Sequence, residues 1–391
     1  MSFVQHLVHL VRWATTACLL LWFSPSLLPP TASASGALQL QAGRPPSQSA
    51  DAEAELQAGI ALTQQGHFSE AIPHFLAAQG HVRDEYAADF NLALCYVATR
   101  QFEPAITLLN SLKDSGRTAP EVNNLLAQAY IGAKQDQKAL AAFEQAVAQT
   151  PDNEKLYLFL ADACSDRQAY DLGLQILDTG LRHLPRSARL HYERGVFLSF
   201  ENQADSAEAE YRRASKLDPG SDIDYMAAGQ AALLEGNIPE AVRVTREGIH
   251  SGHENYILLT LFGDAVADSG AASDQPEFAE AQAALQKSIA EHPDYAGSHI
   301  ALAKLDLLSN RLDDAIAHLE SARKLAPGDP SVYSHLAIAY RRSGKTEKLQ
   351  EVLAILSKLD EAQAAKYKTD SPNKAGYVAS GRSPRKPSQD P

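Results

Sequence analysis

The chain has 391 residues, of which 45% are hydrophobic and 21% are charged, and its formal net charge is −13 at pH 7. This composition is ordinary for a soluble protein. The acidic balance argues against a nucleic-acid binder, because such a protein needs a basic stripe to displace counterions from phosphates.

Residues 1–34 have the order of a secretory signal peptide. Arg12 is their only formal charge apart from any on the histidines, an apolar run follows from Trp13 to Leu28, and Ala32-Ser33-Ala34 places small residues at a cleavage site. The run is shorter than the ~20 apolar residues of a spanning helix. We expect export to the periplasm or the extracellular space, with cleavage near Ala34. An uncleaved membrane anchor is the alternative.

Residues 35–51 are expected to be a flexible leader, because they contain Gly43, Pro45 and Pro46 among several serines. The chain beyond them repeats with a period of 34 residues, which is clearest in Ala188–Ser221. This stretch reads as two amphipathic helices joined by a polar turn. Small and large residues stand there at fixed offsets, with a proline at the end: Gly195, Leu198, Ala207, Tyr211, Ala214 and Pro219.

Steps of 34 residues in either direction find the same pattern. Position 20 of the repeat is small in all but the last, and a bulky side chain at position 8 or 20 would push the two helices apart. Large residues at position 24, such as Phe75 and Tyr211, are expected to fill the space beside them. Position 8 is Gly or Ala throughout: Gly59, Ala93, Ala127, Ala161, Gly195, Gly229, Gly263, Ala303 and Ala337.

The pattern resembles the tetratricopeptide repeat over residues 52–363. The resemblance implies an all-α fold, a right-handed α-solenoid of helix-turn-helix repeats. The seventh repeat is 40 residues long, and its extra residues near Ser269–Pro276 are expected to be a surface insertion or, alternatively, a loop that contacts a partner. The nine expected repeats are 52–85, 86–119, 120–153, 154–187, 188–221, 222–255, 256–295, 296–329 and 330–363.

Residues 364–391 are expected to be a disordered basic tail, since they are poor in apolar residues and rich in proline. Six Lys and Arg residues against Asp370 and Asp390 leave a net charge of 6 − 2 = +4. A solvated tail is the first interpretation. Association with the acidic repeats or contact with an anionic surface is the alternative.

A search for catalytic motifs finds no metalloprotease, phosphate-binding or nucleophile-elbow pattern. His250 and His253 lie three residues apart but where a repeat ends, so no metal site is expected there. Cys95 and Cys164 are two repeats apart, too far for a disulfide, and are expected to be small core residues. We expect no catalytic residue, metal or cofactor, and an enzyme with an unrecognised site stays an alternative.

By resemblance to the family, first-helix positions 2, 5, 9, 12 and 13 line an inner groove in which peptides or partner helices bind. Position 9 holds no Asn and a single Lys, so the carboxylate grip of the chaperone-binding subfamily is not expected. Apolar residues cluster in repeats two to six, rimmed by Asp162, Asp166 and Glu193. The alternative is that several are half-buried between neighbouring helices. The predicted groove residues are Phe90, Leu94, Leu158, Asp162, Tyr192, Val196, Phe200 and Met226.

Together these features predict an exported, non-catalytic scaffold that binds a protein or peptide in its concave groove. We expect no nucleic-acid partner and no stable membrane insertion after signal cleavage. An accessory subunit of a cell-envelope assembly or polysaccharide-export machine is the second interpretation, and the residues do not identify the partner.

Overall fold

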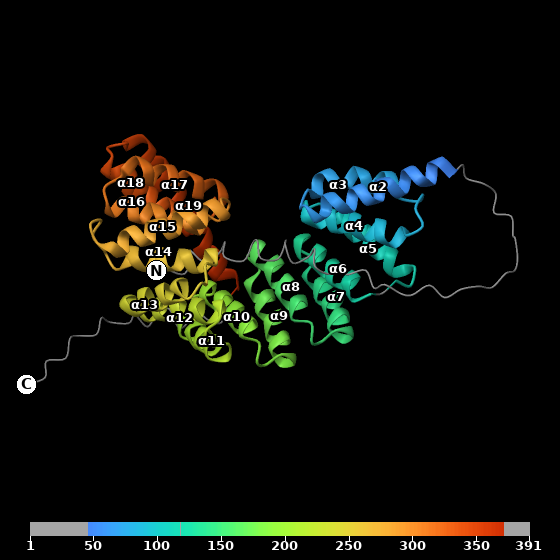
Figure 1. The fold of residues 1–391 in the computed structure, drawn as a ribbon, viewed down its shortest axis with the longest axis horizontal. Coiled ribbons are helices and arrows are strands. Elements are labelled where there is room, and N and C mark those ends of the chain that lie inside the picture. Colours follow the sequence, from blue (N-terminus) through green and yellow to red (C-terminus); the bar gives the residue numbers. More distant parts are fainter. Residues whose placement is uncertain (1–45, 118, 371–391) are drawn as a thin grey trace, which may run out of the picture. The chain divides into compact units, whose positions relative to one another are not determined.

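The computed structural model describes residues 46–117 and 119–370, and in this part of the chain it contains eighteen helices and no strand (Figure 1). The described residues divide into an N-terminal unit, residues 46–237, and a C-terminal unit, residues 238–370. The division falls between the two helices of the expected sixth repeat. The expected signal peptide 1–34, most of the expected leader, and residues 371–391 lie outside the described residues.

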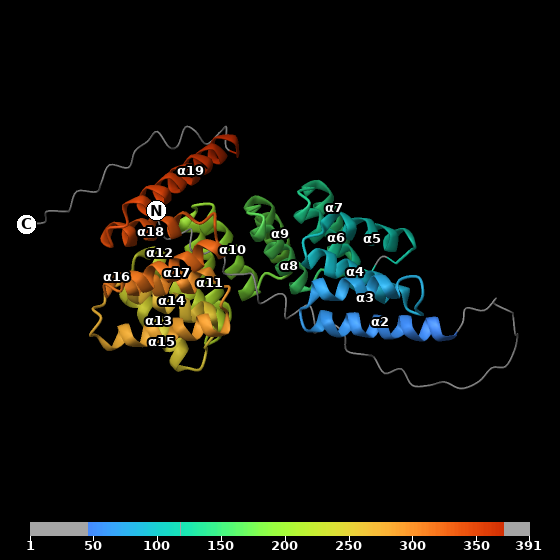
Figure 2. The ribbon, with the colours of Figure 1, turned by 90° about the horizontal axis from the view of Figure 1, so that it is seen from above.

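The N-terminal unit is a series of helices in which sequence neighbours and alternate helices pack on one another (Figure 2). Its helices are α2 (Pro46–Gln64), α3 (Phe68–Ala78), α4 (Glu85–Ala98), α5 (Phe102–Asp114), α6 (Pro120–Gly132), α7 (Asp136–Gln149), α8 (Glu154–Asp166), α9 (Tyr170–His183), α10 (Ala188–Phe200), α11 (Ala204–Leu217) and α12 (Asp222–Glu235). Even-numbered helices are the first helices of the expected repeats, and odd-numbered helices are the second.

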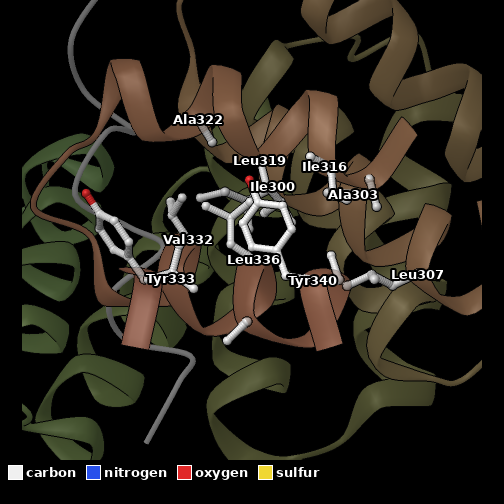
Figure 3. Close-up of a cluster of buried hydrophobic side chains, with 14 of the residues drawn as sticks. Ile300, Ala303, Leu307, Ile316, Leu319, Ala322, Val332, Tyr333, Leu336 and Tyr340 are labelled. Atoms are coloured by element: carbon white, nitrogen blue, oxygen red, sulfur yellow. The ribbon is translucent and has the colours of Figure 1, made fainter. Parts of the chain in front are cut away.

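The C-terminal unit continues the alternation and encloses its own core. Figure 3 shows Val332, Leu336 and Tyr340 of one first helix beside Ile316 and Leu319 of the preceding second helix. Its helices are α13 (Ile238–His250), α14 (Tyr256–Asp268), α15 (Pro276–Glu291), α16 (Ala296–Leu308), α17 (Leu312–Leu325), α18 (Pro330–Arg342) and α19 (Thr346–Asp370).

The expected contact between small and large residues is confirmed at position 8. A Cβ atom added to Gly195 would lie 2.8 Å from the Tyr211 ring, and one added to Gly263 would lie 2.5 Å from Leu285. Both distances are shorter than van der Waals contact, so the partner helix can approach only a glycine at these sites. The large residue is at position 24 of the same repeat in both cases, as the pattern predicts.

The turn between the two helices of a repeat has a feature that the repeat pattern did not predict. The residue at position 15 is left-handed in all nine repeats, with φ between +56° and +79°, and its N–H bonds to the carbonyl three residues earlier. This conformation ends a helix in a Schellman-type cap. The nine residues are Gly66, Arg100, Lys134, Gln168, Asn202, Gly236, Gly270, Asn310 and Gly344.

A side chain at position 4 repeatedly ties a first helix to the turn before it. The Tyr157 hydroxyl donates to the Pro151 carbonyl at 2.7 Å. Nε2 of His299 lies 3.1 Å from the Pro293 carbonyl and must donate to it. Tyr333 with Pro327 and His191 with Pro185 repeat this contact, so tyrosine and histidine at this position have a structural role.

Two expected boundaries are wrong. Residues 46–51 belong to α2 and not to the leader, because Pro46 begins the helix, where its missing N–H has no intrahelical partner to lose. Residues 364–370 belong to α19 and not to the tail. Alanine and lysine there favour a helix, and neither glycine nor proline interrupts the chain before Pro372.

Candidate binding surface

The first helices of the N-terminal unit form a continuous row. Helix α4 packs on α6, α6 on α8, α8 on α10 and α10 on α12. The predicted groove residues stand on α4, α8, α10 and α12 of this row. Their accessibility decides whether a partner could touch them, since a side chain enclosed by its own fold offers no contact area.

The predicted residues of α10 and α12 are mostly enclosed. Tyr192 is 2% exposed, Val196 is 0% exposed and Met226 is 3% exposed. The Tyr192 ring lies 5.5 Å from the Tyr211 ring, centroid to centroid. The groove prediction is therefore wrong for these three residues. The cause for Tyr192 and Val196 is that α8, α9, α11 and α12 all pack against α10.

The predicted residues of α4 and α8 differ among themselves. Phe90, Leu158 and Asp162 are only half-buried. Leu94 on α4 is buried, as is Phe200 on α10, whose ring stacks on Tyr170 with the centroids 4.7 Å apart. The part of the predicted groove that a partner could reach therefore lies at α4 and α8.

Phe90 is held in place by its neighbours. Its ring stacks on Tyr86 one helical turn earlier, with centroids 5.8 Å apart and an interplanar angle of 18°. The guanidinium of Arg117 lies 5.4 Å from the Tyr86 ring centroid on the approach to α6. Burial raises the pKa of Tyr86 above its ordinary value, so the phenol stays neutral. We call Tyr86, Phe90 and Arg117 the aromatic shelf.

Polar side chains of α6 lie between these apolar groups. Asn124 and Gln128, at positions 5 and 9 of the third repeat, are half-buried. The side-chain oxygen of Asn124 has no hydrogen-bond partner among the described residues. This oxygen is itself buried, so a partner can contact the half-buried side chain of Asn124 but not this acceptor. We define the open row as Phe90, Asn124, Gln128, Leu158 and Asp162.

An ion pair links the end of α8 to the turn after α4. Arg100, just after α4, donates to Oδ2 of Asp166, the last residue of α8, at 2.8 Å. The pair joins the second repeat to the fourth across the third. Asp166 is therefore already engaged by a cation, which weakens its expected role as an acidic rim of the groove.

Glu193 is also not a rim residue. It is buried on α10, and one of its carboxyl oxygens has no hydrogen-bond partner among the described residues. Burial raises the pKa of this carboxyl to about 7, and Arg189 only partly opposes the shift. The carboxyl is thus available for protonation near neutral pH but not for contact with a partner.

In the C-terminal unit, charged groups of the first helices pair with one another. Nζ of Lys304 on α16 lies 2.7 Å from Oδ1 of Asp264 and 2.5 Å from Oδ1 of Asp268, both on α14. Burial and the Asp264 charge raise the pKa of Asp268. Burial also lowers the pKa of His335, which Ser331 holds through its carbonyl at 2.8 Å. This cluster is internally satisfied and positions helices.

The remaining candidates for chemistry are clusters of metal-ligating side chains and the two cysteines. Among them, no group of three or more His, Cys, Asp or Glu side chains could hold a metal ion. Cys95 and Cys164 are free and buried, as expected, and burial raises the pKa of the Cys95 thiol to about 11. Such a thiol is a poor nucleophile. Within the described part of residues 46–370, no helix is both long enough and apolar enough to span a membrane.

Comparison with protein families gives the class. Two tetratricopeptide repeat models match this chain, one at residues 62–129, 130–192 and 273–337, the other at residues 188–221. The chain belongs to the tetratricopeptide repeat family, as its spacing predicts.

The curated relatives include anaphase-promoting complex subunit 7 of Mus musculus, 30% identical over 162 residues, and of Homo sapiens, 29% identical over 162 residues. Each match covers 41% of this chain and only 28% of the relative.

Two solved structures are also similar to this chain. A tetratricopeptide repeat protein from Parabacteroides merdae has a TM-score of 0.48 at 16% identity, over 65% of this chain and 98% of that one. The APC/C hetero-tetramer Cut9–Hcn1 has a TM-score of 0.45 at 13% identity, over 73% of this chain and 55% of that one.

Proposed function

We propose that this protein is a non-catalytic scaffold that binds an extended segment of a partner protein along the open row. The observation that carries the proposal is that side chains at the same repeat position differ in their exposure from one repeat to another. Position 5 is half-exposed at Phe90 and Leu158, but it is enclosed at Tyr192 and Met226. Large apolar side chains that stay accessible along one row of helices are typical of interaction sites.

The residues of the open row suggest the chemistry of the segment. Phe90 is pre-ordered by its stack on Tyr86, so binding an apolar side chain there sacrifices little rotamer freedom. Gln128 carries an amide that can bond to the N–H and C=O groups of an extended backbone. Leu158 on α8 offers a second apolar contact, and one first helix, α6, lies between it and Phe90 on α4.

The spacing of the helices sets the length of the segment. Neighbouring helix axes are ~8–10 Å apart, so α4 and α8 are separated by roughly 16–20 Å. An extended chain rises ~3.3 Å per residue. The partner's two apolar side chains should therefore stand about five or six residues apart.

Two further observations support a scaffold. The family stacks repeats into extended surfaces for binding, and the curated relatives are by name subunits of a larger complex. We also propose export, which the signal-like order of residues 1–34 supports.

The test is partner capture followed by a measured affinity. Proteins retained by the purified chain are identified, and the segment of each that binds is located. The affinity of this segment for the chain is then measured by calorimetry. Phe90→Ala should weaken binding by ~2 kcal/mol, about thirtyfold, as truncation of a central aromatic contact does. Leu158→Ala should weaken it less, and both variants should remain folded.

The matched control is Leu76→Ala, which removes an exposed side chain from the second helix α3 in the same unit. It should leave the affinity unchanged. Equal affinity of the wild type and both open-row variants would show that the partner binds elsewhere.

A further inference from the structure

Two histidines face each other inside the eighth repeat. Nδ1 of His299 on α16 lies 3.3 Å from Nδ1 of His318 on α17, and their ring centroids are 5.6 Å apart. They occupy positions 4 and 23 of the repeat. In two other repeats the same positions pair a histidine with a glutamate, so a second imidazole stands here in place of a carboxylate. Those pairs are Glu55 with His74, at 2.6 Å, and His191 with Glu210, at 2.5 Å.

The hydrogen bonds of His299 determine where its own proton lies. Nε2 of His299 donates to the Pro293 carbonyl at 3.1 Å, so a neutral His299 carries no hydrogen on Nδ1. That bare nitrogen is the one that faces His318. His318 must therefore present an N–H from its Nδ1 if the two rings are to form a hydrogen bond.

The other nitrogen of His318 faces a buried carboxylate. Its Nε2 lies 4.0 Å from Oδ2 of Asp306, an oxygen with no hydrogen-bond partner among the described residues. Oδ1 of Asp306 is already engaged, because Arg311 donates to it at 2.6 Å and 3.0 Å. A carboxylate oxygen only accepts hydrogen bonds, so Oδ2 also requires an N–H from His318. A neutral imidazole has one N–H and cannot serve both neighbours.

We propose that the pair of His299 and His318 binds one additional proton, and that this proton holds α17 against α16. With the proton bound, His318 is an imidazolium that donates from Nδ1 to His299 and points Nε2–H toward Asp306. Without the proton, one of the two contacts brings two acceptors together, which is unfavourable. The contact between the two helices is therefore sensitive to pH.

A second proton has no place in the pair. It would have to enter Nδ1 of His299, where it would meet the N–H of His318, donor against donor. Burial lowers the pKa of His299 and the nearby His318 lowers it further, while the bond to the Pro293 carbonyl only partly opposes the shift. The two imidazoles therefore titrate as a coupled pair that holds one proton.

Other charges have a limited influence on this pair. Burial raises the pKa of Asp306, its bonds to Arg311 oppose the shift, and Asp314 on α17 adds a small repulsion. Helices α14, α15 and α18 also pack on α16, but none of their described charged groups shifts the pKa of His299. The charged groups of α14 and α18 that act on α16 surround Lys304 instead: Asp264, Asp268 and His335.

The proton links the helix contact to pH with a definite sign. The first proton is bound more tightly when the helices are in contact, so its contribution is lost as the pH rises above the histidine range, about 6.5. The second proton is bound less tightly in the folded state, so stability also falls as the pH drops below about 6.5. All of these residues belong to the C-terminal unit, so the inference does not depend on the open row.

The first measurement is nitrogen-15 NMR of the histidine side chains in the full chain, assigned with His299→Gln and His318→Gln. Nitrogen shifts separate a bare ring nitrogen from one that carries hydrogen. At about pH 6, below the ordinary histidine value, His318 should carry hydrogen on both nitrogens and His299 on Nε2 alone. A doubly protonated His299 beside a neutral His318 would overturn the proposal.

The second measurement is hydrogen exchange of the α17 amides, Leu312–Leu325, corrected for the intrinsic effect of pH. Opening of α17 should be rarest near pH 6.5 and about tenfold more frequent near pH 8.5, if the proton affinity of the pair changes by about tenfold when the helices separate. His318→Arg keeps a cation at every pH, so it should remove the increase toward pH 8.5. His318→Gln and Asp306→Asn should each flatten the profile.

The matched control is His250→Gln, which removes an exposed histidine of the same unit that pairs with Glu280 at 2.9 Å. It should keep the wild-type profile. Melting temperatures show that each variant is folded. The proposal is wrong if α17 exchange has the same pH dependence in the wild type, His318→Gln and Asp306→Asn.

Discussion

At the scale of single residues, Gly195 is required by the ring opposite it. A Cβ atom at this position would lie 2.8 Å from the fully buried Tyr211 ring. Gly195→Ala should lower the free energy of unfolding by ~1–3 kcal/mol through overpacking, although alanine is the better helix former. Gly195→Leu should lower it further. Denaturant unfolding measures the effect.

The control for this prediction is Gly328→Ala. Nothing lies within 4 Å of a Cβ atom added there, so its stability should match the wild type. A Gly195→Ala protein as stable as the wild type would mean that the helices of this repeat are not in the contact described.

Glu193 should make stability depend on pH. Burial raises its pKa from the ordinary value of 4.5 to about 7, so the folded state holds a proton that the unfolded state releases. The contribution of Glu193 to the free energy of unfolding is fully present below about pH 4.5, and it is lost as the pH rises through about 7. Glu193→Gln should therefore be more stable than the wild type at pH 8, by up to about 3 kcal/mol.

The measurement compares denaturant unfolding of the wild type and Glu193→Gln at pH 5 and pH 8. The difference between the two proteins isolates this carboxyl from Asp329, whose pKa burial also raises, to about 6. An equal difference at both pH values would show that Glu193 is ionised in the folded state.

At the scale of the helix pair, the left-handed residue at position 15 ends each first helix. Lys134 adopts φ of +61°, which is strained for a residue with a Cβ atom. Lys134→Gly should raise the free energy of unfolding by up to ~1 kcal/mol, because glycine adopts this conformation without strain. Lys134→Ala keeps the strain and should gain nothing, so a stabilised alanine variant would contradict the explanation. Thermal unfolding of both variants tests it.

The contrast between Tyr192 and Phe90 belongs to the same scale. Both are at position 5, but Tyr192 lies inside the packing of α10 and Phe90 is half-exposed on α4. Tyr192→Ala should cost ~3–5 kcal/mol of stability, as large-to-small changes in a core do, and Phe90→Ala should cost less. Melting curves of the two variants measure the order, and the reverse order would place Phe90 in the core.

At the scale of the whole molecule, residues 1–34 are expected to direct where the chain works. If they are removed, one arginine is lost and the net charge becomes −13 − 1 = −14. We predict that exported protein begins near Ser35. Sequencing the N-terminus of secreted or periplasmic material tests this prediction. Full-length protein in the membrane fraction would instead support an uncleaved anchor.

The sequence by itself determined the repeat architecture. Small residues at positions 8 and 20 with a large one at position 24 decide how closely two helices of a pair can approach. That contact forms within one repeat, so numbering the residues of a single repeat is enough to predict it. The turn residue at position 15 could also have been found, since four of the nine are glycine. The pattern is hard to see because position 15 also holds Arg100, Lys134 and Gln168. The turn imposes the left-handed conformation on these residues although they do not favour it.

Only the tertiary structure decided which residues of the first helices are accessible. Phe90 and Tyr192 have the same position and similar chemistry, yet one is open and the other enclosed. The ion pairs of Arg100 with Asp166 and of Lys304 with Asp264 join residues 66 and 40 positions apart. The exposure of a first-helix side chain and its choice of ion-pair partner depend on how successive repeats stack. The stacking in turn depends on side chains from several repeats at once. The periodic pattern describes one repeat at a time, so it specifies the helices but not the surface that they leave open.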